Sequence, residues 1–206
     1  MTPIASPSTG YRMSFTAASL CIRESAILAQ RYLDLGNWEQ VSSEAFSENL
    51  LQVRTQSSLR RLLRELTTRL ETLSPAELDL LTKATEPHQA QVLWLAVCRC
   101  YPFVAEFAVE VVRERYLSLK YELPLEEFDA FFNRKAQWHT ELDSISPSTH
   151  NKLRQVLFRL LRETGLLSTQ RTIQGVQLNP QLAQLLRQGR PEEALYFPTF
   201  DTQIKT

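Results

Sequence analysis

Residues 152–168 read KLRQVLFRLLRETGLLS, a stretch with one apolar and one polar side. The apolar residues recur at the spacing of an amphipathic helix. Glycine commonly follows the last residue of a helix, and Gly165 is in that position here. The pattern predicts a helix that begins near Pro147, a residue suited to the first helical turn, and ends at Gly165. Its expected buried side consists of Leu153, Val156, Leu157, Leu160 and Leu161.

The opposite side of this helix carries side chains that hydrogen-bond phosphates or base edges: Ser148, Asn151, Lys152, Gln155, Arg159 and Arg162. A solvated surface tolerates these residues, and a nucleic-acid groove uses them. Residues 171–178 (RTIQGVQL) then alternate as a strand does. A helix, a Gly-Leu-Leu turn and a short β-hairpin follow one another in winged-helix modules, with residues 126–138 as the supporting helix. Such modules also serve structural or protein-binding roles, so both interpretations stay open.

A second amphipathic helix is expected at about residues 55–73, where six leucines form one stripe. Its other side carries four arginines within a sector of roughly 120°: Arg54, Arg60, Arg61 and Arg64. Guanidinium groups this close repel one another unless an anion or nearby acids offset them, and arginine suits bidentate phosphate contacts. The face is therefore either a solvated surface, with Glu65 and Glu71 as partners, or a footprint on a phosphate backbone.

The charge distribution permits a local anion site on a molecule that is neutral overall, with 23 basic and 23 acidic residues. Residues 54–70 hold five arginines and one acid, and residues 146–171 hold five cations and one acid. Between them, residues 106–129 carry seven acids and three cations. This separation predicts two basic regions flanking an acidic one.

The remaining pattern predicts an all-α fold, a compact helical bundle with a small winged-helix-like element near the C-terminus. We expect a loose tail at residues 1–13, a helical domain at 14–121, and a second subdomain at 122–206 whose apolar end docks on the body. One helix is expected from Ser14 or Thr16 to Leu35. Asn37, Ser74 and Asn179 are expected to cap the helices that follow them, and Ser74 and Glu77 to form a capping box.

Several kinds of site are excluded by pattern. The five glycines are isolated, so there is no phosphate-binding glycine loop. Cys98 and Cys100 lie about 200° apart on a helix and cannot chelate one metal, and His139 near Glu141 lacks a nucleophile. We expect no catalytic residue, metal, cofactor or small-molecule substrate. Residues 91–112 are interrupted by Arg99, Pro102 and two glutamates, so we expect a buried helix pair and no membrane association. The three cysteines form no disulfide framework and residues 1–15 lack the apolar run of a signal peptide, so we expect a cytoplasmic protein.

Longer stretches of the chain resemble the BrxA family of BREX bacteriophage-exclusion systems. The resemblance lies in MSFTAASLCIRESAILAQRYLDLGNWEQV (13–41), ENLLQVRTQSSLRRLLRELTTRLETLS (48–74) and LWLAVCRCYPFVAEFAVEVVRERYL (93–117). It continues in LPLEEFDAFFNRKAQWHTELDSISPSTHNKLRQVLFRLLRETGLL (123–167) and ALYFP (194–198). These phrases span roughly residues 12–198, so the resemblance concerns nearly the whole chain.

The resemblance implies a helical protein without enzymatic activity, with a fold similar to the NusB antitermination factor, that acts in phage defence beside a methyltransferase and an ATPase. Our hypothesis is a non-catalytic protein that binds duplex DNA through Arg54, Arg60, Arg61, Arg64, Lys152, Gln155, Arg159 and Arg162. The alternative is a module that assembles other BREX proteins. An RNA target rests on fold analogy alone.

Overall fold

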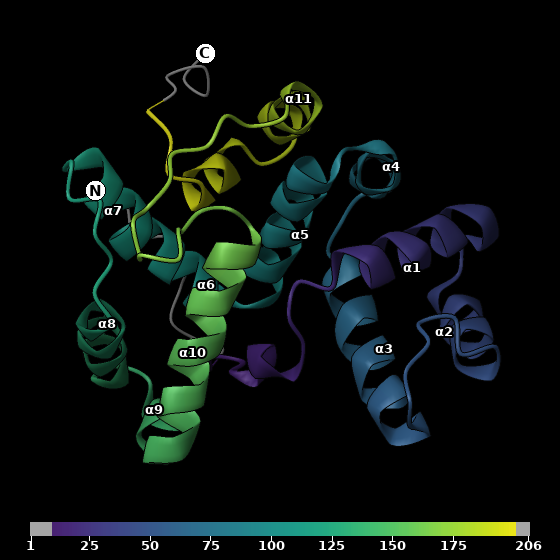
Figure 1. Cartoon of the computed structure of the whole chain (residues 1–206), viewed down its shortest axis with the longest axis horizontal. Coiled ribbons are helices and arrows are strands. Elements are labelled where there is room, and N and C mark those ends of the chain that lie inside the picture. Colours follow the sequence, from purple (N-terminus) through teal and green to yellow (C-terminus); the bar gives the residue numbers. More distant parts are fainter. Residues whose placement is uncertain (1–9, 201–206) are drawn as a thin grey trace.

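The computed structural model describes residues 10–200, which fold almost entirely into helices and contain no β-sheet. Figure 1 shows two groups of helices on either side of α5 (Glu86–Cys100). The first group comprises α1 (Ile22–Leu35), α2 (Trp38–Ser47), α3 (Gln56–Leu70) and α4 (Pro75–Lys83). The second comprises α6 (Pro102–Phe107), α7 (Glu114–Leu117), α8 (Glu126–Ala136), α9 (Thr140–Asp143) and α10 (Pro147–Glu163).

In the first group, α2 and α4 begin at the capping residues that the sequence predicts. The Asn37 side chain accepts hydrogen bonds from the backbone of Glu39 and Gln40 at the start of α2. At the start of α4, Ser74 and Glu77 bond to each other's backbone N–H groups. This capping box confirms the prediction, because both partners lie within four residues of each other.

Helix α5 is the central element of the core. All its residues from Ala90 to Cys98 are buried, and it contacts α1, α3, α4 and α6. Trp94 is fully buried and donates a hydrogen bond to the carbonyl oxygen of Tyr196, 3.0 Å away. That bond joins α5 to the C-terminal segment, which contains α11 (Pro180–Gln188) and the 3₁₀ helix η3 (Pro191–Tyr196).

The second group is built around phenylalanine side chains. Phe103 meets Phe128, Phe131 and Phe132 of α8 at ring-centroid distances of 5.1–6.0 Å. Between α6 and α7 the helix widens into a π-helical segment, η2 (Ala108–Arg113). Buried side chains from Tyr11 to Phe197 form one connected cluster, so both groups share a core.

The helix predicted from Ser14 or Thr16 to Leu35 is wrong, because the chain forms the 3₁₀ helix η1 (Ser14–Ala17) and then α1. Between them Cys21 adopts a left-handed conformation with φ 51°. The break is held from outside: the buried guanidinium of Arg69 donates to the carbonyls of Phe15, Ala18 and Ser19. Those acceptors are occupied by a side chain 50 or more residues away, which a local pattern cannot reveal.

The strand predicted at residues 171–178 is also wrong. Within residues 10–200 the pairing there is limited to two isolated antiparallel bridges, Glu122 with Thr172 and Leu167 with Ile173. Arg171 has a φ of 63°, and beyond Ile173 the chain turns away, with the Val176 N–H bonded to Pro198. The segment is too short and too strongly turned to extend the ladder, so the winged-helix element is not confirmed.

Residues 1–9, part of the expected loose tail, lie outside the described residues. Residues 10–13 are not loose, because Tyr11 is buried against Phe103 and its hydroxyl bonds to Glu106 at 2.5 Å. None of the individual helices in residues 10–200 combines the length and the apolar composition that a membrane span requires. Residues 86–117 reach that length only as two helices bent by 116° at Tyr101.

Candidate nucleic-acid interface

The arginines of the α3 face point away from the core, as the leucine spacing predicts. Leu59, Leu63, Leu66 and Leu70 are buried on the inner side, whereas Arg60, Arg61 and Arg64 are exposed on the outer side. Arg54 is exposed in the turn that precedes the helix. None of these four arginines has a carboxylate within 4.0 Å in the part of the chain that the structure describes.

Their contacts are with neutral groups instead. The Arg60 guanidinium lies 5.1 Å from the ring centre of Phe46, and Arg61 donates to the carbonyl oxygen of Ala17 at 3.3 Å. Such contacts hold the side chains without cancelling their charge. The outer side of α3 is therefore strongly positive.

Glu65, one of the two expected neutralising acids, is turned inward. Its carboxylate accepts a hydrogen bond from Arg69 at 2.8 Å and another from the Tyr101 hydroxyl. Burial and then this hydrogen bond raise the pKa of Tyr101 well above its ordinary value. Glu65 thus offsets Arg69 in the core, and the outer arginines keep their charge.

Helix α10 presents a second basic face. Lys152, Gln155 and Arg162 are exposed, and within residues 10–200 none of them forms an ion pair. Arg159 is half-buried, with its Nε 3.6 Å from a Glu163 carboxylate oxygen. Arg154, on another side of the helix, is withdrawn from this face by Asp129, 2.6 Å away.

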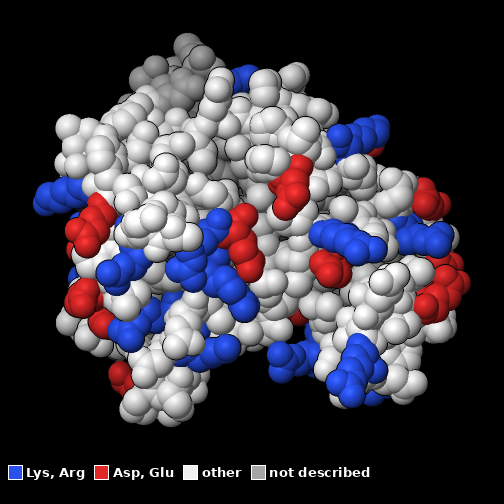
Figure 2. Space-filling view, viewed as in Figure 1, with Lys and Arg blue, Asp and Glu red and all other residues white. Residues whose placement is uncertain are grey.

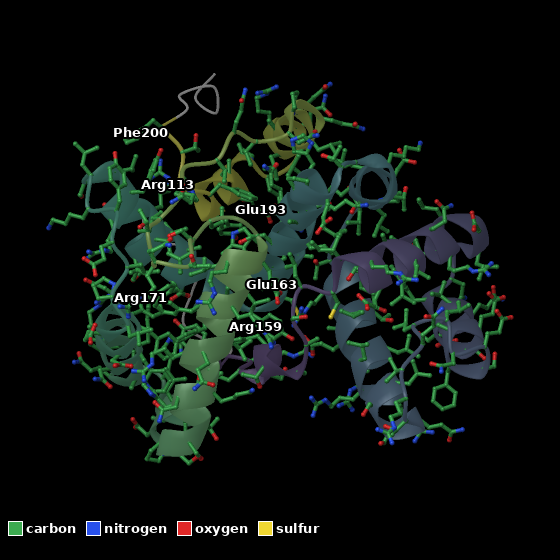
Figure 3. All side chains as sticks on the ribbon, in the orientation of Figure 1. Arg113, Arg159, Glu163, Arg171, Glu193 and Phe200 are labelled. Atoms are coloured by element: carbon green, nitrogen blue, oxygen red, sulfur yellow. The ribbon has the colours of Figure 1, made fainter. Side chains whose placement is uncertain are left out.

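The two faces are connected through η1 and the residues after it. The η1 segment contacts both α3 and α10, and Glu163 accepts a hydrogen bond from the Leu20 N–H at 2.7 Å. Figure 3 places Arg159 and Glu163 on the side of α10 that faces this segment. In Figure 2, lysine and arginine side chains gather over α10 and over the lower end of α3, on either side of a notch. Two stretches about 100 residues apart thus contribute cations to one side of the molecule.

The acids of residues 106–129 have partners of their own. Lys135 reaches Glu106 at 2.5 Å and Glu110 at 2.7 Å, and Arg115 binds Glu127. Arg154 likewise pairs with Asp129, so four of the seven acids in this stretch are offset by a neighbouring cation and do not compensate the basic faces. The overall neutrality of the chain therefore coexists with a positive surface.

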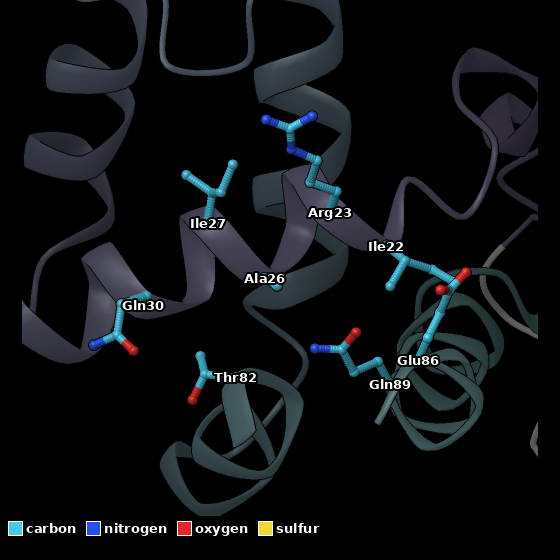
Figure 4. Close-up of a pocket in the computed structure, with 8 residues that line it drawn as sticks. All are labelled: Ile22, Arg23, Ala26, Ile27, Gln30, Thr82, Glu86 and Gln89. Atoms are coloured by element: carbon cyan, nitrogen blue, oxygen red, sulfur yellow. The ribbon is translucent and has the colours of Figure 1, made fainter. Parts of the chain in front are cut away.

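The other cavities and side-chain clusters that we considered provide weaker support for a binding or catalytic site. A cavity of about 530 Å³ between α1, α4 and α5 is lined by three apolar side chains, Ile22, Ala26 and Ile27, and by five polar ones, Arg23, Gln30, Thr82, Glu86 and Gln89 (Figure 4). Residues 10–200 contain no group of three His, Cys, Asp or Glu side chains placed to hold a metal ion. His139 lies 3.1 Å from Glu141 and stacks on Tyr11, which explains its position by packing.

Residue-level reasoning missed Arg12, which it assigned to the tail. Arg12 lies beside Arg61 and Arg64 at the edge of the α3 face. Its place depends on the packing of Tyr11 and on η1, so only the folded chain reveals it.

Comparisons with known proteins agree with this whole-chain picture. A BREX protein BrxA from Escherichia coli O9:H4 is 28% identical over 170 residues, covering 82% of this chain and 80% of that protein. A BREX protein BrxA from Paramagnetospirillum magneticum is 23% identical, covering 88% and 92%. The crystal structure of an uncharacterized protein from Magnetospirillum magneticum has the same fold, with a TM-score of 0.80 at 22% identity over 92% of this chain and 98% of the other. The BrxA family model matches residues 9–189, and the chain belongs to the BrxA family.

Proposed function

We propose that this protein is a non-catalytic component of a BREX phage-defence system that binds duplex DNA through the outer sides of α3 and α10. The relatives named as BREX proteins support a place in a BREX system. The observation that carries the second is the unpaired cations of both helices on one side of a neutral molecule (Figure 2). The protein would act in the cytoplasm without a metal, a cofactor or a small-molecule substrate.

The proposed contact follows from the chemistry of the side chains. Arginines on α3 would neutralise backbone phosphates, and Lys152, Gln155, Arg159 and Arg162 would lie in or along a groove. Each neutralised phosphate releases counterions, so affinity depends steeply on salt. With about six phosphates contacted, the log–log slope of affinity against salt would lie near −5.

A charge-reversal pair tests the α3 face. We expect Arg60→Glu with Arg64→Glu to weaken duplex binding at least about tenfold at moderate salt and to flatten the salt slope. The matched control is Lys83→Glu with Lys120→Glu, which changes the net charge equally at exposed positions on α4 and after α7. Fluorescence anisotropy with a labelled duplex measures both. If the two pairs weaken binding equally, the effect of the α3 variant follows from net charge alone, and a local site on α3 is contradicted.

Treating α8 and α10 as the supporting and recognition helices of a winged-helix-like module is part of this proposal, as is a NusB-like arrangement. The order of α8, α10 and the turn after Gly165 supports it. Two isolated β-bridges stand where a wing would lie.

An assembly role is the second candidate, because large apolar side chains are exposed after α7 and at Phe200. Leu119, Tyr121 and Phe200 are 65%, 38% and 52% exposed, and the Phe200 ring lies 4.6 Å from that of Tyr116. Such side chains fit a protein partner better than they fit DNA. Co-purification with other BREX proteins that is lost in Leu119→Ser, while duplex binding by that variant is unchanged, would favour this role.

A further inference from the structure

A cavity of about 260 Å³ opens between η1 and the outer side of α3. Its wall combines three guanidinium groups with two hydroxyl groups: Arg12, Arg61 and Arg64 with Ser14 and Thr16. Charged nitrogen donors and hydroxyl donors that converge on one small space are the groups that proteins use to hold phosphate oxygens. The composition of this wall therefore indicates an anion site.

Two of the three arginines of this cavity, Arg12 and Arg61, contact neutral groups. The Arg12 Nε donates to the Ser14 hydroxyl at 3.0 Å, and its guanidinium lies 5.5 Å from the Tyr101 ring centre. Arg61 donates one bond to the Ala17 carbonyl. Within residues 10–200, none of the three has a carboxylate within ion-pair distance. Most of their donor capacity remains free.

Glu65 also lines the cavity, but its charge is offset elsewhere. One of its oxygens accepts from both Arg69 and Tyr101 in the core. The three arginines at the wall therefore outweigh the single acid, whose charge Arg69 already balances. The cavity carries an excess of positive charge that a bound anion would relieve.

The cavity is also held in shape. Arg69 donates to the carbonyl oxygens of Phe15, Ala18 and Ser19, and Glu163 accepts from the N–H of Leu20, so the backbone from η1 to the start of α1 is fixed to α3 and α10. A site whose backbone is fixed before binding loses little freedom when the ligand arrives.

We propose that this cavity binds one phosphate group and that Arg12 is a principal ligand. The inference rests on the proposed function, because we assign the phosphate to the backbone of the bound duplex. A free phosphate offers the same oxygens, and the experiment separates the two sources.

The experiment compares Arg12→Gln, Arg60→Gln and Lys83→Gln with the wild-type chain. Arg12 lines the cavity, Arg60 lies on the same face outside it, and Lys83 is the control on α4. Two measurements are made on each protein: the side-chain Nε signals of ¹⁵N-labelled arginines during titration with inorganic phosphate, and duplex affinity across salt.

We expect inorganic phosphate to shift the Arg12, Arg61 and Arg64 signals in a saturable way, and Arg12→Gln to abolish the shifts at Arg61 and Arg64. Arg12→Gln should also weaken duplex binding several-fold and make the salt slope less steep by about one. Arg61→Gln, an exposed position, serves as a second variant should Arg12→Gln prove poorly folded.

The outcomes separate the two proposals. If Arg12→Gln leaves both the phosphate shifts and the salt slope unchanged while Arg60→Gln flattens the slope, the cavity proposal is overturned and DNA binding by α3 stands. If inorganic phosphate binds but Arg12→Gln leaves the salt dependence of duplex affinity unchanged, the ligand is a free phosphate and the assignment to the DNA backbone is wrong. If neither Arg12→Gln nor Arg60→Gln alters duplex affinity, the DNA contact of this face fails as well.

Discussion

Arg99 and Arg60 show how neighbouring groups decide what one residue type does. Arg99 lies on α5 and binds Glu77 at 2.7 Å and Glu193 at 2.7 Å, with all three side chains largely buried. Arg60 lies against the ring of Phe46, pairs with no acid in residues 10–200 and faces solvent. The first arginine ties the C-terminal segment to the first helical group, whereas the second keeps a charge available for a ligand.

Replacing Glu77 by glutamine tests the buried pair. Burial raises the pKa of the Glu77 carboxyl, but hydrogen bonds from Arg99 and the Ser74 backbone outweigh it and hold the pKa below its ordinary value. A carboxylate with a lowered folded-state pKa stabilises the fold at pH values above its ordinary pKa, and this contribution is lost as the pH falls through the folded-state value. We expect Glu77→Gln to lower the free energy of unfolding at neutral pH by about 3 kcal/mol.

Urea denaturation at neutral pH and near pH 3 measures the effect. Because wild-type Glu77 is protonated at sufficiently low pH, the difference between the two proteins should shrink there. A difference that stays the same size at both pH values would mean that packing, and not the charge of Glu77, sets the loss.

Gly175 supplies a second residue-scale prediction. A Cβ atom at this position would lie 2.0 Å from the Tyr116 hydroxyl oxygen, and Tyr116 is itself in ring contact with Tyr121 and Phe200. Gly175→Ala should therefore lower the free energy of unfolding by about 1–3 kcal/mol. Gly189→Ala is the control, because its nearest atom lies at 3.5 Å, and it should change stability by less than about 0.5 kcal/mol. Thermal melts of both variants compare them.

At the scale of elements, the sequence predicts well those features that depend on residues close together in the chain, such as helix caps. Asn37, Ser74 and Asn179 cap α2, α4 and α11 as expected, since each cap needs only partners two or three residues away. The break before α1 was not predictable, because it depends on Arg69 and Glu163 reaching back to residues 15–20. The bridge between Glu122 and Thr172 likewise joins residues 50 positions apart, which a local pattern does not reveal.

The cap of α2 offers a test at this scale. Asn37 accepts two backbone hydrogen bonds, and its loss in Asn37→Ala should lower the free energy of unfolding by about 1 kcal/mol. Thr85 precedes α5 without a side-chain capping bond, so Thr85→Ala should have a much smaller effect. Urea denaturation of both variants distinguishes them, and equal losses would count against the capping bonds as the cause.

For the whole molecule, the sequence indicated basic and acidic regions but could not place them. Four of the seven acids in residues 106–129 pair with Lys135, Arg115 or Arg154, whose positions follow from the packing of α7, α8 and α10. The cations of α3 and α10 meet on one side because η1 packs against both helices. The helical periodicity of the sequence predicted the basic face of each helix, and tertiary packing placed both faces on one side of the molecule. Arg12 joins this surface only through that packing.

If one duplex spans both faces, charge removal on α3 and on α10 should combine in a definite way. Arg60→Gln and Arg162→Gln would each flatten the salt slope by about one, and the double variant by about two, because each removes a separate phosphate contact. Their effects on the binding free energy should add, since the two residues share no partner in residues 10–200. Anisotropy titrations also give the stoichiometry, expected at one duplex per protein.

Shortening the duplex sharpens this prediction. For a duplex that reaches only one face, one of the two substitutions should lower the affinity and the other should leave it unchanged. For a longer duplex, both substitutions should lower the affinity. Two duplexes bound per protein, or a double variant no weaker than the stronger single variant, would mean that the faces do not act on one DNA molecule. The notch between them would then separate two independent surfaces, with α10 free to contact a protein partner while α3 holds DNA.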